Sequence, residues 1–134
     1  MQSRHISVVI ARTAGEVYEY VSDPENLPLW ATGLAQSEVV SEGDTLLVDS
    51  PMGAVKVTFA PRNPFGVLDH DVVLSSGEAV SNPLRVVNHP EGAEIIFTVR
   101  QLADLAAFER DSETVLADLE RLRGILEESG TGGN

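Results

Sequence analysis

Apolar residues recur along the C-terminal third of the chain at steps of three or four positions. Such steps place them on one side of a single long helix. This apolar stripe consists of Leu105, Phe108, Val115, Leu119, Leu122 and Leu126, with the small Ser112 filling one gap. The opposite side, expected in solvent, carries Glu109, Asp111, Glu113, Asp118, Glu120, Arg121 and Glu127. A helix with one apolar stripe must bury it against another element, and the rest of the chain offers a sheet.

The N-terminal part predicts one strand followed by a short helical region. Residues 5–11 alternate and are rich in β-branched side chains, which favours a strand. Thr13 and Glu16 have the spacing of a capping box, so we expect a helix over residues 14–22. A second helix is expected over residues 25–30, where an internal proline keeps it brief or irregular.

The middle of the chain predicts a run of strands separated by turns. Turn residues such as Ser41-Glu42-Gly43-Asp44 and His89-Pro90-Glu91-Gly92 recur at a spacing of about ten residues, which indicates an antiparallel meander. The strands are expected at residues 35–40, 45–50, 54–60, 67–74, 79–88 and 93–101. Pro83 lies inside one of them and predicts a bulge or an edge there, because proline donates no backbone hydrogen bond.

This order of elements predicts an α+β fold, in which a curved antiparallel sheet of about seven strands grips the long C-terminal helix. A single helix cannot fill a strongly curved sheet, so we expect a cavity suited to small apolar molecules. The length of 134 residues fits one domain, which we place at residues 1–128, followed by a flexible tail at residues 129–134.

The composition narrows the classes of partner. The chain has 9 basic and 21 acidic residues, and its net charge of −12 repels nucleic acid and anionic membranes. No stretch approaches the ~20 apolar residues of a membrane span. The absence of cysteine excludes disulfides and thiol catalysis and fits a cytoplasmic protein. We expect no metal, because Asp69, His70 and Asp71 point alternately along their strand and form no cluster. We expect no cofactor, because the sequence has no phosphate-binding glycine loop and no Rossmann fingerprint.

The sequence also resembles a known family. Residues 17–30, VYEYVSDPENLPLW, are similar to the N-terminal signature of the START-like, helix-grip superfamily (SRPBCC, Bet v 1-like), in its polyketide cyclase/dehydrase branch. The resemblance continues through residues 65–72 and 82–87 to the final helix. It implies a curved seven-stranded sheet around that helix and a deep cavity for lipids, sterols, polyketides or other hydrophobic ligands. Some members are cyclases, dehydratases or hydrolases, so the resemblance implies no single activity.

His70 is the strongest polar candidate for chemistry. Leu68, His70, Val72 and Leu74 share the more apolar face of their strand, so we expect the imidazole to point inward. Three roles are open to it: a core histidine bonded to a neighbour, a ligand contact, or a general base. Asn82 lies among aliphatic residues on the next strand, either as a partner of His70 or as a second ligand contact.

The remaining candidates would line the predicted cavity or place a charge near it. Trp30 follows the short helices and is expected at the mouth of the cavity, as a core anchor or a lining residue. Arg85 and Arg100 are expected in solvent, whereas an inward arginine would bind a ligand carboxylate. The predicted ligand-binding residues are Trp30, Phe59, Leu68, His70, Asn82, Leu84, Phe97 and Phe108.

We therefore predict a protein that binds a small hydrophobic ligand, lipid- or polyketide-like, between the sheet and the C-terminal helix. One alternative is a polyketide cyclase or dehydratase with His70 as its general base. Another is an interaction module that forms a homodimer and needs no ligand. Its apolar edge would consist of Leu46, Leu47, Val48, Met52 and Val55.

Overall fold

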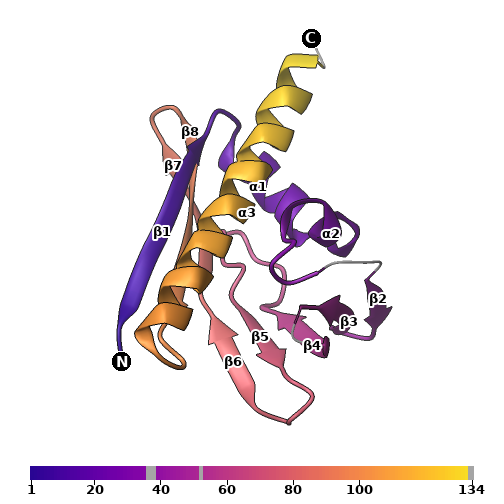
Figure 1. The fold of residues 1–134 in the computed structure, drawn as a ribbon. Helices are drawn as coiled ribbons and strands as arrows, with labels where there is room; N and C mark the ends of the chain where they lie inside the picture. Colours follow the sequence, from indigo (N-terminus) through magenta and orange to yellow (C-terminus); the bar gives the residue numbers. More distant parts are fainter. Residues whose placement is uncertain (36–38, 52, 133–134) are drawn as a thin grey trace.

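A curved antiparallel β layer lies along one side of the C-terminal helix (Figure 1). The computed structural model describes residues 1–35, 39–51 and 53–132. In chain order the elements are β1 (Ser3–Ile10), α1 (Ala14–Ser22), the 3-10 helix η1 (Pro24–Asn26), α2 (Leu27–Trp30), β2 (Val40–Glu42), β3 (Thr45–Ser50), β4 (Gly53–Phe59), β5 (His70–Val73), β6 (Ala79–Asn82), β7 (Leu84–His89), β8 (Gly92–Arg100) and α3 (Leu105–Gly132). The predicted helix-grip class is confirmed, with eight strands among these residues rather than about seven.

The capping box predicted at the first helix is present. The hydroxyl of Thr13 accepts from the Glu16 backbone N–H, and the Glu16 carboxylate accepts from the Thr13 N–H, both at 3.1 Å. The predicted helix at residues 25–30 is observed as the pair η1 and α2. The strand predicted at residues 35–40 includes residues 36–38, which lie outside the described residues, as does Met52; beyond that gap β2 begins at Val40.

The strands form two hydrogen-bonded sheets, with the orders β1-β8-β7 and β2-β3-β4-β5-β6. The segment just before β5 connects them, because it pairs with β7. The Leu68 N–H donates to the Leu84 carbonyl, and the Val86 N–H donates to the Gly66 carbonyl. The two sheets are therefore parts of one bent layer.

Pro83 lies at the bend of this layer. It divides the strand predicted at residues 79–88 into β6, which pairs with β5, and β7, which pairs with β8. The Leu84 N–H at the bend donates to the Asp69 carboxylate at 2.9 Å instead of to a strand carbonyl. The bulge or edge predicted at Pro83 is thus the corner where the strand changes sheets, which suits a residue without an N–H.

The helix α3 crosses the concave side of the layer and packs on β1 and β8 (Figure 1). Phe108, Leu119 and Leu122 are at most 1% exposed, which confirms the centre of the predicted stripe. Leu105 does not belong to it: this residue is 51% exposed, because it begins α3 one turn before Phe108 reaches the sheet. Across the described ranges, no helix combines the length and apolar character that a membrane span requires.

Candidate functional site

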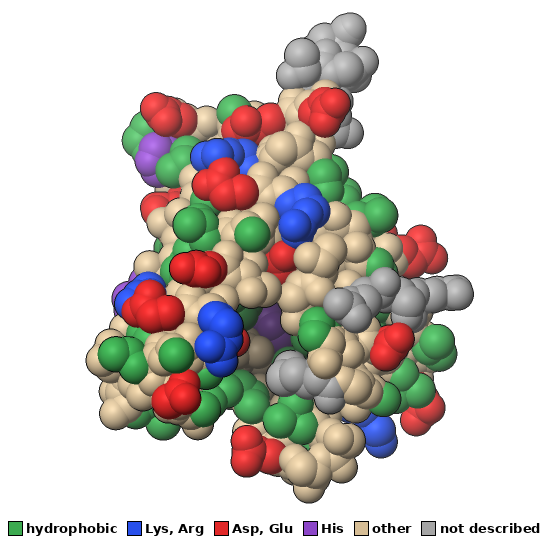
Figure 2. Space-filling model, viewed as in Figure 1, with side chains coloured by type: hydrophobic (Ala, Val, Ile, Leu, Met, Phe, Trp, Pro, Cys, Tyr) green, Lys and Arg blue, Asp and Glu red, His purple; other side chains and the backbone are tan. Residues whose placement is uncertain are grey.

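A cavity of about 540 Å³ lies between α3, α2 and the inner face of the β layer. Figure 2 shows this side of the molecule hollowed beside α3, with a histidine side chain at the bottom of the hollow. Aliphatic and aromatic side chains make up most of the wall. Its polar and charged members are Glu78, Ser81, Asn82, His70, Arg100, Asp111, Thr114 and Asp118.

Six of the eight predicted ligand-binding residues lie on this wall, namely Trp30, Phe59, His70, Asn82, Leu84 and Phe97. The other two lie elsewhere. Leu68 is buried in the core, because residues 67–69 pair with β7 and the strand bends before His70 starts its pairing with β6. Phe108 is buried beneath the Arg4 guanidinium, which lies 4.8 Å from the centre of its ring.

His70 is 5% exposed and points inward as predicted. Its ring lies between Phe59, whose ring centre is 4.8 Å away, and Phe97, at 6.0 Å. Its Nδ1 is 3.1 Å from the Leu68 carbonyl oxygen. Burial lowers the pKa of His70, an effect that outweighs the opposing contributions of this hydrogen bond and of the nearby Asp69 and Asp71 carboxylates.

Asn82 lies directly opposite His70 in the β5–β6 register. The two strands are therefore neighbours, which is the arrangement in which the histidine and the amide were expected to satisfy each other. Among the described residues, however, no hydrogen bond joins their side chains, and the Asn82 amide bonds to no other group. Both side chains consequently keep hydrogen-bonding capacity on the cavity wall.

Trp30 combines the two roles considered for it, since it is 4% exposed in the core and also lines the cavity. Its indole Nε1 is buried and has no hydrogen-bond partner among the described residues. Buried donors without an acceptor are rare in folded proteins, because desolvating the N–H is unfavourable. The nitrogen is buried by the protein's own atoms, so Trp30 contributes its ring and not its N–H to the cavity wall.

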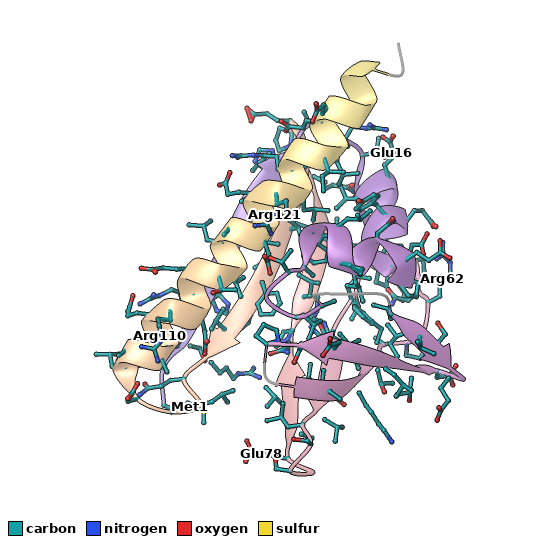
Figure 3. The ribbon with its side chains drawn as sticks, turned by 45° about the vertical axis from the view of Figure 1, so that its right-hand side comes forward. Met1, Glu16, Arg62, Glu78, Arg110 and Arg121 are labelled. Atoms are coloured by element: carbon teal, nitrogen blue, oxygen red, sulfur yellow. The ribbon has the colours of Figure 1, made fainter. Side chains whose placement is uncertain are left out.

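Asp118 is a wall residue that the sequence did not reveal, because its position on α3 predicts solvent. It is 8% exposed, and its carboxylate accepts from the Thr32 hydroxyl, the Gly33 N–H and Arg121. Arg121 also donates to the Trp30 carbonyl at 3.0 Å, and Figure 3 shows it where α3 adjoins α2. One signal in the sequence pointed to these two residues: Asp118 and Arg121 directly precede Leu119 and Leu122, which are buried.

Arg85 and Arg100, the two strand arginines considered as ligand contacts, lie in different surroundings. Arg85 is exposed, as predicted, and makes two hydrogen bonds to the Asp69 carboxylate, at 3.0 and 2.7 Å. This pairing lowers the pKa of Asp69. Arg100 is also exposed but borders the cavity, where Glu78, Asp111 and Asp118 place three carboxylates on the same wall.

A second hollow, of about 730 Å³, lies on the outer side between α1, β7 and residues 62–66. Four of its polar side chains, those of Tyr18, Glu19, Arg62 and Asn63, are already paired. Arg62 bonds to Glu19 and lies over the Tyr18 ring, and the Asn63 N–H donates to the Tyr18 hydroxyl. Arg62 is on the side of the molecule away from α3 (Figure 3). The cavity beside α3, with unpaired donors and acceptors, is therefore the stronger candidate site.

A bent antiparallel layer that grips a C-terminal helix around a cavity is the START-like, or SRPBCC, fold. The sequence pattern of a family described as polyketide cyclase / dehydrase and lipid transport matches residues 1–123. The chain belongs to this family, within the superfamily that its resemblance indicates. None of the curated proteins matches it significantly.

Solved structures share the fold at low sequence identity. The Aha1 dimer from Colwellia psychrerythraea has a TM-score of 0.74 and 14% identity, over 95% of this chain and 97% of that one. The protein XoxI from Bacillus cereus has a TM-score of 0.72 and 13% identity, over 93% and 95% of the two chains. DynU16, a putative protein in the dynemicin biosynthetic locus, has a TM-score of 0.72 and 17% identity, over 95% of this chain but 48% of its own.

Proposed function

We propose that this protein binds a small, mostly apolar molecule, lipid- or polyketide-like, in the cavity between α3 and the β layer. The observation that carries the proposal is the wall itself, which surrounds about 540 Å³ with mostly apolar side chains and includes the side chains of His70 and Asn82. Burial of apolar ligand surface supplies the affinity, at about 25 cal/mol per Å². The proposed contacts are Trp30, Phe59, His70, Asn82, Leu84 and Phe97.

The family and one structural neighbour support this proposal. The family description joins polyketide cyclases and dehydrases with lipid transport, which fits a lipid- or polyketide-like ligand. DynU16 is described as a protein of a biosynthetic locus. Cavities of a few hundred Å³ with a few convergent polar groups commonly accommodate small molecules. A cytoplasmic location and the absence of a nucleic-acid partner remain predictions from the composition.

Native mass spectrometry of the purified protein tests the proposal. We expect a co-purifying small molecule, released by an organic solvent and identified by its mass. In a reconstitution series, His70→Ala should weaken rebinding of that molecule while leaving the circular dichroism spectrum intact. His5→Ala on the exposed side of β1 is the matched control and should rebind normally. A protein that carries no ligand and takes up none from lipid or polyketide extracts would contradict the proposal.

Catalysis at the same cavity is the second candidate, favoured by the position of His70. The imidazole lies among apolar side chains with a lowered pKa, so it is uncharged at neutral pH and able to accept a proton. A cyclase or dehydratase using this base should lose activity only when the pH falls below the ordinary histidine range. A turnover rate that His70→Phe leaves unchanged would exclude this role.

Homodimerisation without a ligand is the third candidate. The apolar edge predicted for this contact is wrong in part, because Leu46, Val48 and Val55 are buried in the core. The exposed edge strand of the five-stranded sheet is β2, on which Val40 is 55% exposed. One structural neighbour is described as a dimer. Light scattering coupled to size exclusion measures the mass in solution, and a monomer across the accessible concentration range would exclude this candidate.

A further inference from the structure

Phe65 is far more exposed than the other aromatic residues of the chain. The chain has four phenylalanines, two tyrosines and one tryptophan. Six of these seven side chains are buried or half-buried, whereas Phe65 is 78% exposed. An aromatic ring in water is unfavourable, and aromatic residues are enriched at the centres of protein interfaces. Phe65 therefore points to a contact surface on the outer side of the molecule.

The loop that carries Phe65 is held in one conformation by Asn63. The side-chain nitrogen of Asn63 donates to the carbonyl oxygens of Pro61 and Val67, both at 2.9 Å. Its side-chain oxygen accepts from the backbone N–H of Phe65 at 2.9 Å and of Val67 at 3.1 Å. The Asn63 backbone N–H donates to the Tyr18 hydroxyl on α1 at 3.0 Å. A side chain presented by such a loop loses little conformational freedom on binding, which favours docking.

The second hollow, termed the outer hollow, lies beside this ring and has room to receive one. Its volume is about 730 Å³, and Phe65 is one of its lining residues. Apolar side chains line it between α1 and β7, among them Ala14, Val86 and the 42% exposed Val87. At Gly15, nothing beyond its chain neighbours and its own helix backbone lies within 4 Å of the position of a Cβ. The outer hollow therefore has space for an aromatic side chain from another molecule.

The outer hollow is electrically neutral on a strongly acidic protein. Its two charged lining residues, Glu19 and Arg62, form an ion pair, and Arg62 marks this surface on the side away from α3 (Figure 3). The chain as a whole has a net charge of −12. Two copies repel each other over most of their surfaces, so they approach most easily where the surface is neutral and apolar. A basic partner would be attracted to the acidic surfaces instead, which favours a second copy as the occupant.

We propose that a second copy of this chain docks on the outer hollow, so that Phe65 of each copy enters the outer hollow of the other. Phe65 and the outer hollow lie side by side, and a two-fold axis brings each ring against the hollow of the second copy. This surface is separate from the edge strand β2. It also shares no lining residue with the cavity beside α3, so the inference does not depend on ligand binding.

Sedimentation equilibrium of the purified protein measures its mass in solution and the dissociation constant of the dimer. We expect the wild-type protein to pass from monomer to dimer as its concentration rises. Phe65→Ala should raise the dissociation constant by at least about tenfold, because it removes the ring at the centre of the contact. Leu116→Ala is the matched control, since Leu116 is also exposed but lies on α3, outside the outer hollow. It should dimerise like the wild-type protein.

Two exposed helical glycines test the outer hollow itself. Gly15→Leu places a side chain in the open space of the hollow and should abolish the dimer while α1 still forms. Gly124→Leu on α3 is the control, because a Cβ there also meets nothing within 4 Å. It should leave the dissociation constant unchanged, and circular dichroism verifies that both variants fold.

The dependence on salt distinguishes this contact from one held by opposite charges. Screening weakens the repulsion between two acidic copies, so the dimer should become tighter as the ionic strength rises. A wild-type protein that stays monomeric would overturn the proposal, whether a small molecule, another protein or only solvent lies in the outer hollow. A dimer that survives Phe65→Ala or Gly15→Leu, that the control variants disrupt equally, or that weakens with added salt would also overturn it.

Discussion

The Asp118 carboxylate on α3 accepts a hydrogen bond from the Gly33 backbone N–H at 3.1 Å. The same carboxylate accepts from the Thr32 hydroxyl at 3.2 Å and from Arg121 at 2.8 Å. Because Gly33 follows the α2 segment that carries Trp30, this contact ties one wall of the cavity to the helix that closes it. The close approach also excludes a larger residue, since a Cβ at Gly33 would lie 2.4 Å from Thr114 Cγ2.

Removing this carboxylate should destabilise the fold. Asp118→Ala leaves the Gly33 N–H and the Thr32 hydroxyl without their acceptor, and we expect the free energy of unfolding to fall by about 2 kcal/mol. Urea unfolding followed by fluorescence measures it conveniently, because Trp30 is the only tryptophan of the chain. Glu113→Ala, an exposed position on the same helix, is the control and should change stability by less than about 0.5 kcal/mol. Equal urea midpoints for the two variants would show that the Asp118 contacts contribute nothing.

Two glycines allow the effect of a close contact to be separated from that of backbone strain. Gly66 has φ of +74°, and a Cβ there would lie 2.2 Å from the Val86 carbonyl oxygen. Gly77 has φ of +90°, with nothing within 4 Å of its Cβ position. Gly77→Ala should therefore cost only the strain of a left-handed residue, about 1–2 kcal/mol.

Gly66→Ala should cost clearly more, because the pairing of residues 66–68 with β7 must also open. Thermal unfolding of both variants under one set of conditions measures the difference in melting temperature. A Gly66→Ala protein as stable as Gly77→Ala would mean that the bend between the sheets relaxes freely.

The helix α3 offers a matched pair of leucines for testing the core. Leu122 is fully buried, whereas Leu116 on the same helix is 43% exposed. We expect Leu122→Ala to lower the free energy of unfolding by about 2–5 kcal/mol, because it removes contacts and leaves a void. Leu116→Ala should cost less than about 1 kcal/mol. Denaturant titration gives both values, and equal losses would contradict the packing of α3 described here.

The sequence predicted those features that depend on neighbours along the chain. The Thr13–Glu16 capping box and the burial of Leu119 and Leu122 follow from spacing alone, because a helix has a fixed period. The inward direction of His70 follows in the same way from the alternation of a strand. Six of the eight predicted ligand-binding residues accordingly lie on the cavity wall.

Features that depend on distant contacts were not predictable. Leu68 shares the alternation of His70 but lies off the wall, because its segment pairs with β7 after a bend. Asp118 has the spacing of a solvent-facing residue, yet the segment following Trp30 approaches it from more than eighty positions away. The missing hydrogen bond between His70 and Asn82 depends on side-chain geometry, which their register alone does not determine.

The lowered pKa of His70 should make stability depend on pH near neutrality. Burial lowers this pKa in the folded protein, whereas in the unfolded chain it is about 6.5. Above that value the ring is neutral in both states. As the pH falls below about 6.5, the unfolded state binds a proton that the folded state does not, so unfolding becomes easier. For one proton the slope approaches about 1.4 kcal/mol per pH unit.

Urea titrations at pH 7.5 and pH 5.5 measure this effect, with His70→Phe as the control. The other two histidines are present in both proteins, so their contributions cancel in the comparison. Carboxylates contribute little in this window: the pKa of Asp69 is lowered by Arg85, that of Glu16 is about 2, and unfolded carboxyl groups titrate near pH 4. We expect the wild-type protein to lose more stability than His70→Phe on acidification. Parallel losses would mean that the His70 imidazole takes up its proton as readily in the folded protein as in the unfolded chain.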